Sequence, residues 1–294
     1  MKIIVAGGAG TLGQYAIREF LDHGHEVLCI DTATPAGNTC RSLVIDLRET
    51  KSLYSAFEDV DAVVHLARKR FPYTANGFDR VSQVWKTPDV AGDAERFTHN
   101  VAMTYNVLAA SLQAGVKKIV SGSSLAVYGL YYPFHPLLPD YLPVDENHPL
   151  RPQDPYGISK LVGEQLCDAL ARKSDMQIAS LRFAGIATGA QYPTLLERAR
   201  DPLCRGTGAL WSYIDVRDAA TACRLALEAN FQGHRAFNIC ASTTIMNVPT
   251  AELIRQHLPE VKQIRAGLNG NWSGYDPTKA QAGLGFRAIH FLGN

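Results

Sequence analysis

The feature that most limits how this chain can fold is a glycine-rich turn near its start, with glycines at positions 7, 10 and 13. The turn separates an apolar run, Ile3 to Val5, from a segment of helical periodicity, Leu12 to His23. Glycines let the backbone approach a diphosphate, whose charge the N–H groups of the following helix stabilise. We therefore expect a dinucleotide to bind at this turn. The expected contacts come from Gly7, Gly10, Thr11, Leu12 and Gly13.

Apolar runs alternate with helix-period segments through the first two thirds of the chain, which predicts an α/β fold with a doubly wound parallel sheet. Sheets of this kind bind ligands at the carboxyl ends of their strands. The expected strands are Ile3–Val5, Val27–Ile30, Leu43–Ile45, Ala62–Val64, Lys118–Val120 and Ile178–Leu181. The expected helices are Leu12–His23, Lys51–Phe57, Thr98–Ala114 and Tyr156–Lys173.

The same pattern suggests how the chain is divided. We expect residues 1–183 to form a nucleotide-binding core that also carries the catalytic residues. Residues 184–294 are expected to form mostly a small substrate-binding lobe, with 209–241 returning to the core.

Three stretches lack regular periodicity: Arg68 to Arg96, Leu130 to Arg151 and Gly189 to Gly208. Long irregular loops in compact enzymes are usually functional, so we interpret these as walls and lids over a substrate cleft. Tolerated surface insertions are the alternative. Beyond Ile245 the only helix signal is Thr250 to His257.

Composition limits the kinds of partner. A net charge of +1, with 46% hydrophobic and 19% charged residues, gives no electrostatic reason to expect nucleic acid or a membrane, so a small molecule is the expected partner. No apolar stretch approaches membrane-spanning length. The cysteines show neither a C-x-x-C pair nor zinc spacing, so we expect reduced thiols, a cytoplasmic location and no metal. They are Cys29, Cys40, Cys167, Cys204, Cys223 and Cys240.

Acidic residues follow the second and third expected strands. Asp31 lies about 20 residues beyond the glycines, where a carboxylate accepts hydrogen bonds from the adenosine ribose and repels a 2′-phosphate. This favours NAD over NADP, with a helix or turn cap as the alternative role. Asp46 and Leu47 follow the third strand, where the acidic side chain is placed to reach the adenine amino group, although capping of the next helix is nearly as good an explanation of Asp46.

A phenol and an ammonium lie four residues apart at Tyr156 and Lys160, on one face of an expected helix. Oxidation of an alcohol needs a base for the hydroxyl proton, and a neighbouring lysine cation favours the phenolate over the phenol. Ser123 and Ser124 end a strand at the expected cleft, where a hydroxyl can hydrogen-bond the reacting oxygen. The set therefore predicts hydride transfer from a secondary alcohol.

These motifs together resemble the extended short-chain dehydrogenase/reductase family, in its NAD-dependent epimerase/dehydratase branch. The matching pieces, in order, are Gly7-x-x-Gly10-x-x-Gly13, Val64-His65-Leu66-Ala67, Asn100, Ser123 to Gly129, Tyr156-x-x-x-Lys160, Leu181-Arg182-Phe183 and Tyr213 to Ala220.

The resemblance implies a Rossmann-type sheet with a small C-terminal substrate lobe, and NAD as cofactor. It also implies a homodimer packed through the helices that begin at Thr98 and Tyr156. By resemblance, the catalytic residues are Ser124, Tyr156 and Lys160, with Leu66, Ala67 and Asn100 added to the cofactor contacts.

The substrate positions depart from those of nucleotide-sugar enzymes. Gly185 replaces a usual asparagine, Ala190 a usual proline, and Trp211 an arginine. Arg68 stands where a small residue is usual, and either grips an anionic or hydroxyl-rich substrate or begins a solvated basic run. The expected substrate contacts are Arg68, Ser123, Ser124, Tyr156 and Trp211.

Three functions remain open. The first is an NAD-dependent dehydrogenase acting on a sugar or sugar acid. The second is a nucleotide-sugar epimerase or dehydratase, such as a UDP-sugar 4-epimerase, which retains its cofactor. The third is a non-enzymatic NAD sensor, which the intact Ser124, Tyr156 and Lys160 disfavour.

Overall fold

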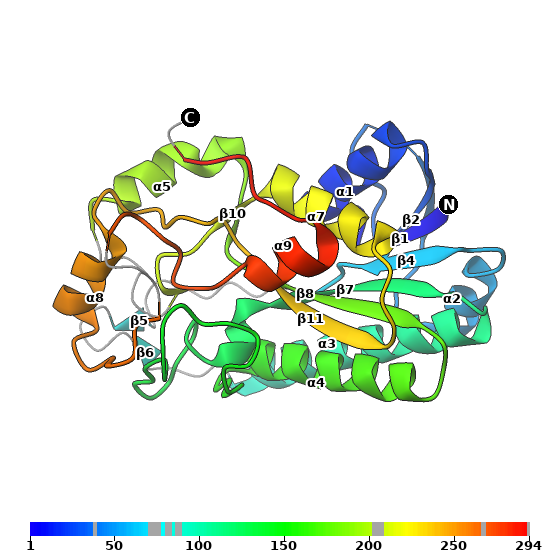
Figure 1. The fold of residues 1–294 in the computed structure, drawn as a ribbon. Helices are drawn as coiled ribbons and strands as arrows, with labels where there is room; N and C mark the ends of the chain where they lie inside the picture. The colour runs from blue at the N-terminus through cyan, green and yellow to red at the C-terminus, as the bar shows by residue number, and fades with distance from the viewer. Residues whose placement is uncertain are drawn as a thin grey trace.

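The computed structural model describes residues 1–37, 40–69, 78–79, 84–85, 90–201, 209–265 and 269–292. A seven-stranded parallel sheet forms the centre, in the order β11-β8-β7-β4-β1-β2-β3 (Figure 1). Its strands are β1 (Lys2–Ala6), β2 (Glu26–Asp31), β3 (Arg41–Val44), β4 (Ala62–His65), β7 (Lys118–Ser124), β8 (Gln177–Phe183) and β11 (His234–Ile239).

Helices cover both faces of this sheet. In Figure 1, α3 and α4 lie below it and α1 and α7 above it. The α-helices are α1 (Thr11–Asp22), α2 (Thr50–Ala56), α3 (Val90–Gln113), α4 (Pro155–Arg172), α5 (Tyr192–Arg198), α7 (Val216–Glu228), α8 (Thr250–His257) and α9 (Thr278–Leu284), with 3-10 turns η2 (Leu125–Tyr128) and η3 (Gly189–Gln191). Short pairs are formed by β5 (Phe78–Asp79) with β6 (Val84–Trp85), and by β9 (Ile186–Ala187) with β10 (Ile214–Asp215).

Two apolar clusters hold the layers together, because alternate residues of a strand face opposite sides of the sheet. Ile3 and Val5 of β1 pack with the α1 and α7 side, whereas Ile4 and Ala6 pack with the α3 and α4 side. Both faces of β1 are therefore buried, as expected for a parallel sheet covered by helices. The predicted doubly wound α/β fold is confirmed, with all six predicted strands present.

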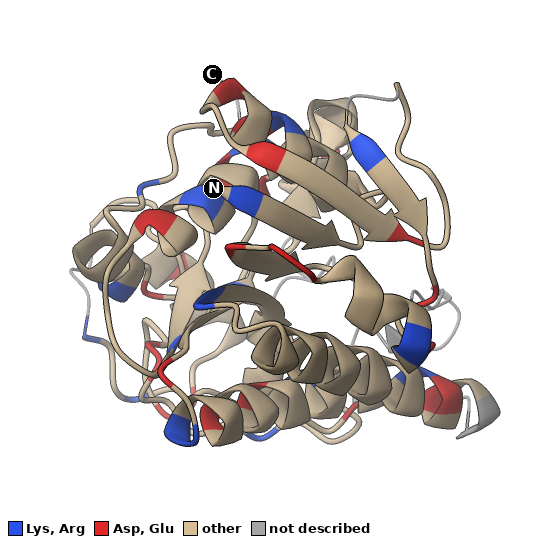
Figure 2. Ribbon diagram, turned by 90° about the vertical axis from the view of Figure 1, so that its right-hand side faces the viewer, with Lys and Arg blue, Asp and Glu red and all other residues tan. Residues whose placement is uncertain are grey.

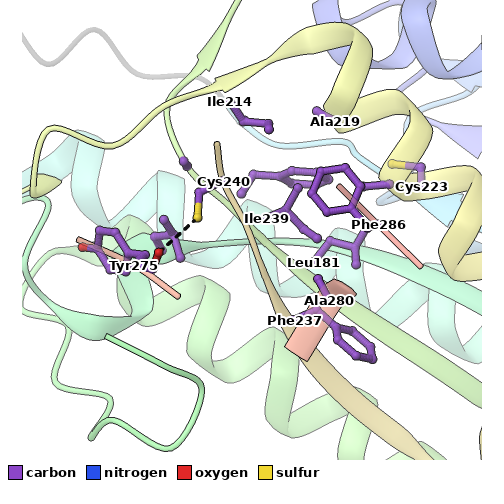
Figure 3. Packing of buried hydrophobic residues seen from close by; sticks show 14 of the residues in the cluster. Leu181, Ile214, Ala219, Cys223, Phe237, Ile239, Cys240, Tyr275, Ala280 and Phe286 are labelled. Atoms are coloured by element: carbon purple, nitrogen blue, oxygen red, sulfur yellow. Dashed lines mark hydrogen bonds between the residues drawn. The ribbon is translucent and has the colours of Figure 1, made fainter. Parts of the chain in front are cut away.

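The end of the chain returns to the sheet. Strand β11 pairs in parallel with β8, and Phe237 and Ile239 pack with Leu181 of β8 (Figure 3). Ala280 of α9 and Phe286 join the same cluster. The division into residues 1–183 and 184–294 stays a prediction, and the pairing of β11 is consistent with the expected return of 209–241 to the core.

Some sequence expectations were wrong. The stretch from Gly189 to Gly208 contains η3 and α5, and the stretch from Arg68 to Arg96 ends in the first turns of α3. The predicted helix at Thr250–His257 is confirmed as α8, but α9 was missed. Residues 202–208, including Cys204, lie outside the described residues. Among the described helices, none is both long and apolar enough to cross a bilayer.

The sheet changes direction of winding between β1 and β4, since the chain runs outward from β1 to β3 and then crosses to β4 on the other side. Such a switch point opens a crevice at the strand ends. Gly7 follows β1 here with a φ of 92°, and the N–H groups of Leu66 and Ala67 both donate to the Ala6 carbonyl, at 2.7 and 3.0 Å. The glycine-rich turn and the end of β4 are thus held against each other.

We predict that Gly13→Ala destabilises the protein by about 1–3 kcal/mol, the usual cost of overpacking. A Cβ at position 13 would lie 2.3 Å from the Gly7 carbonyl oxygen, so backbone would have to move. Urea unfolding followed by circular dichroism measures the loss. Gly189→Ala is the control, because its Cβ meets nothing within 4 Å. Equal stability of the two variants would contradict the close approach.

Candidate active site

One cavity of about 960 Å³ lies at the carboxyl ends of the strands. Its lining brings together nearly all of the residues expected from the sequence. They are Gly7, Gly10, Thr11, Leu12, Gly13, Asp31, Asp46, Leu47, Leu66, Ala67, Arg68, Ser123, Ser124, Tyr156 and Lys160.

The glycine end of the cavity fits a dinucleotide. A Cβ at Gly7 would lie 2.4 Å from the Ala67 nitrogen, so only glycine allows the turn to sit this close to β4. Helix α1 begins directly beyond the turn, at Thr11, and points its N-terminus at the cavity lining. At the end of β2, Asp31 accepts hydrogen bonds from the N–H groups of Ala9 (3.0 Å) and Thr32 (2.7 Å). The carboxylate is thereby fixed beside the turn.

Asp46 serves a local role as well as lining the cavity. It accepts hydrogen bonds from the backbone and side chain of Arg48, and this pairing lowers its pKa to about 2. Arg48 also contacts His99 of α3, with 2.8 Å between the two nitrogens. Asp46 is therefore ionised at neutral pH and held in place.

The start of α4 sets the position of the tyrosine. Asp154 caps the helix by accepting hydrogen bonds from the N–H groups of Tyr156 and Gly157, both at 3.0 Å, and Pro155 supplies a first residue that needs no N–H partner. This fixes Tyr156 in the first turn, with Lys160 one turn further along the same face.

Lys160 is buried among groups that hold its ammonium. Its Nζ donates to the Gly122 carbonyl of β7 at 2.6 Å and lies 5.8 Å from the centre of the Tyr156 ring. Burial, and secondly the charge of Arg68, lower the pKa of Lys160 to about 8. The group is still mostly protonated at neutral pH, so it supplies a positive charge beside the phenol.

The two serines have different surroundings. Ser124 ends β7 and caps η2, its Oγ accepting from the Ala126 N–H at 3.2 Å. No described residue accepts a hydrogen bond from this hydroxyl, so its hydrogen can point to a substrate. Ser123 instead donates to the buried carboxylate of Glu164 at 2.6 Å. Ser123 therefore supports the strand end more than it faces a ligand.

Asn100 and Trp211 are not brought into the cavity lining. Asn100 accepts from the Lys69 N–H at 2.8 Å and donates to the Ser159 hydroxyl at 3.2 Å, so it ties the segment after β4 to α4. Trp211 is 2% exposed in the apolar core, beside His257. The indole of Trp211 is therefore too buried to stack on a sugar in this cavity.

Sequence reasoning missed several lining residues at the far end of the cavity. Tyr131 and Tyr132 lie just beyond η2, and Gly185 donates its N–H to the Tyr131 hydroxyl at 3.3 Å. Tyr132 packs edge-on to Tyr156, with 6.4 Å between ring centroids. The sequence did hold a signal for these two residues, because the tyrosine pair lies within Leu130 to Arg151, a stretch that we interpreted as a wall of the substrate cleft. Other missed lining residues are Gly122, Phe183, Ala184, Ile186 and Gln191.

A glycine-rich turn, a serine and a tyrosine–lysine pair around one crevice are typical of a nucleotide-dependent short-chain dehydrogenase/reductase. The chain belongs to the NAD-dependent epimerase/dehydratase family, whose model matches residues 3–240. The family and the NAD cofactor predicted from the sequence are thus confirmed, and the protein is an NAD-dependent enzyme of the extended type.

Three curated relatives are named either as a sugar dehydrogenase or as UDP-glucose 4-epimerases. The L-arabinose 1-dehydrogenase (NAD(P)(+)) of Haloferax volcanii is 29% identical, over 78% of this chain and 83% of its own. A UDP-glucose 4-epimerase of Streptococcus mutans is 28% identical, over 90% and 85%. A putative UDP-glucose 4-epimerase of Methanocaldococcus jannaschii is 32% identical over 65% of this chain, and the match spans 58% of that relative.

Among solved structures, a short-chain dehydrogenase/reductase superfamily protein from Agrobacterium tumefaciens with bound NAD has a TM-score of 0.72. It is 24% identical, and the match covers 99% of this chain and 94% of that one. At this identity the similarity concerns the fold, which it supports over nearly the whole length.

His65 gives the site a pH-sensitive element. Its Nε2 lies 3.2 Å from the Thr104 hydroxyl, whose hydrogen goes to the Asn100 carbonyl, so the imidazole must donate from Nε2. Nδ1 is then unprotonated, buried and without a partner in the described residues. Burial, with a smaller effect of the Lys160 charge, lowers the pKa of His65 to about 3.

We therefore predict acid sensitivity with a defined sign. Between pH 6.5 and 3 the unfolded chain protonates this histidine and the folded chain does not, so the free energy of unfolding falls as pH falls. His65→Gln should flatten this slope by on the order of 1 kcal/mol per pH unit. Urea titrations from pH 6 to 4.5 measure it, with exposed His23→Gln as control. An unchanged slope in His65→Gln would refute the assignment.

Proposed function

We propose that the protein is a dehydrogenase that oxidises a secondary alcohol of a free sugar or sugar acid. The main support for this proposal is the set of residues that line the end of the cavity beside Tyr156, where the substrate would bind. Its described lining offers hydroxyls and aromatic rings from Tyr131, Tyr132 and Tyr156, and a bare backbone at Gly185 in place of an asparagine amide. A nucleotide sugar brings two phosphate charges that need several donors, whereas the described lining at this end offers one arginine without an acidic partner, Arg68. The L-arabinose 1-dehydrogenase relative supports the same class of substrate.

The chemistry follows from three side chains. The Ser124 hydroxyl donates a hydrogen bond to the substrate oxygen, and the Tyr156 phenolate accepts the proton of the reacting hydroxyl. The Lys160 ammonium is held by the Gly122 carbonyl and places a positive charge beside the Tyr156 ring. Bound NAD would supply the acceptor for the hydride of the carbinol carbon. The alcohol thus becomes a carbonyl, with its proton on Tyr156.

A UDP-sugar epimerase is the second candidate. It is favoured by the Streptococcus mutans relative, which covers more of the chain than the dehydrogenase does. Such an enzyme would begin with the same oxidation at the same residues. The two candidates differ in whether NADH leaves the protein.

We also infer a cytoplasmic homodimer that packs through α3 and α4. Tyr105 of α3 is 53% exposed and Ile158 of α4 is 36% exposed, so each helix carries a large apolar side chain on its outer surface.

Lys, Arg, Asp and Glu are interspersed over the elements in Figure 2, which fits a small-molecule enzyme. Five described cysteines are free thiols, and Cys40 alone among them is not fully buried.

Tyr156→Phe should lower kcat by at least about 100-fold, because it removes the proton acceptor, while the Kd for NAD changes by less than about threefold. Lys160→Ala should weaken NAD binding as well as turnover. NADH absorbance and calorimetry supply the two measurements. Tyr54→Phe on α2 is the matched control and should retain wild-type turnover. Near-normal kcat in Tyr156→Phe would exclude this tyrosine as the base.

The function itself is tested with added NAD and panels of sugars, uronic acids and nucleotide sugars. NADH absorbance and the stereochemistry of the substrate are followed together. We expect NADH to accumulate stoichiometrically with a free sugar or sugar acid. Inversion of a nucleotide sugar without net NADH would replace the dehydrogenase by the epimerase.

A further inference from the structure

Arg68 is held in place by its neighbours, and its side chain forms neither a hydrogen bond nor an ion pair with a described residue. The Ala67 N–H before it donates to the Ala6 carbonyl, and the Lys69 N–H after it donates to the Asn100 side chain. The backbone is thus fixed on both sides. The side chain extends into the cavity, where its guanidinium carbon lies 5.7 Å from the centre of the Tyr156 ring.

Two cations at this end of the cavity, Arg68 and Lys160, have no carboxylate partner among the described residues. Lys69 is paired with Glu95 at 3.0 Å, but Arg68 forms no ion pair with a described residue. Lys160, the second cation, donates to a neutral carbonyl, and the carboxylate of Glu164, which interacts with its charge, is paired with Arg182 at 2.7 Å. The carboxylates in the described lining, Asp31 and Asp46, follow β2 and β3 at the opposite end.

The charges of Arg68 and Lys160 repel one another. An anion bound on the solvent side of these two groups would reduce that repulsion. A guanidinium binds a carboxylate through two parallel N–H···O bonds, matching it in both charge and shape. Arg68 lies beside the ring of the tyrosine that is proposed as the base, so an anion bound by Arg68 would lie close to the hydroxyl that is oxidised.

We propose that the substrate is a sugar acid, whose carboxylate pairs with Arg68 while its secondary hydroxyl faces Tyr156 and Ser124. This rests on the proposed dehydrogenase function and narrows its substrate class. A phosphate on the sugar offers similar chemistry, but the planar guanidinium matches a carboxylate in shape as well as in charge, and the test therefore includes hexose phosphates.

The test compares hexuronates with neutral hexoses of the same configuration, such as galacturonate with galactose, by kcat/KM from NADH absorbance. Wild type should prefer the acid by about 100-fold or more, since a lost charge pair typically costs that much. Arg68→Gln should lower this preference by at least about 30-fold. Arg68→Lys, which keeps the charge and loses the planar fork, should give an intermediate preference. Lys69→Gln is the matched control and should keep the preference within about threefold of wild type.

Three results would overturn the proposal: equal use of acid and neutral sugar by wild type, an acid preference that survives in Arg68→Gln, or a stronger, Arg68-dependent preference for hexose phosphates. Failure of the dehydrogenase function looks different, namely inversion of UDP-sugars without NADH. In that case we would measure the binding of galacturonate to the NAD-loaded protein by calorimetry, which tests whether Arg68 binds the carboxylate. Binding lost in Arg68→Gln but kept in Lys69→Gln supports it, and equal or absent binding in wild type and Arg68→Gln refutes it.

Discussion

The buried ion pair between Arg182 of β8 and Glu164 of α4 ties the helix that carries Tyr156 and Lys160 to the sheet. Both side chains are 5% exposed, so removing either partner would strand a charge in the core, typically at a cost of about 3–5 kcal/mol. The pair extends in both directions: Ser123 donates to Glu164, and Arg182 donates to Tyr128, whose hydroxyl donates to Asn238 of β11. The strand that ends in Ser124 is therefore connected through this network to α4, β8, η2 and β11.

This anchoring explains how the three proposed catalytic residues, which come from two elements, line the same part of the cavity. Ser124 is placed by the strand, and Tyr156 and Lys160 are placed by the cap that starts α4. The Gly122 carbonyl joins them, because it belongs to the serine strand and accepts from the Lys160 ammonium. Preorganised charge of this kind costs no rearrangement when the substrate oxygen begins to lose its proton.

Local patterns were enough to predict the parallel sheet, the glycine turn, and the tyrosine and lysine, since each depends on spacing within a short segment. Strand β11 was missed because His234 and Arg235 hide its apolar alternation, and α9 because Ala280 and Leu284 are its only buried residues. Helix α5 was missed because Pro193 argues against a helix, although it occupies a first-turn position that tolerates proline. The roles of Ser123 and Asn100 depend on Glu164 and Ser159, distant in sequence, so no local pattern could reveal them.

The way the segment after β4 is attached has an evolutionary consequence. Residues 67 and 69 are held by their main-chain N–H groups, which every residue except proline possesses. The side chain between them carries none of the bonds that keep the nucleotide turn against the sheet. Position 68 is thus open to exchange without loss of the cofactor cradle, and a lineage with this fold can change the charge of the metabolite it accepts by a single codon.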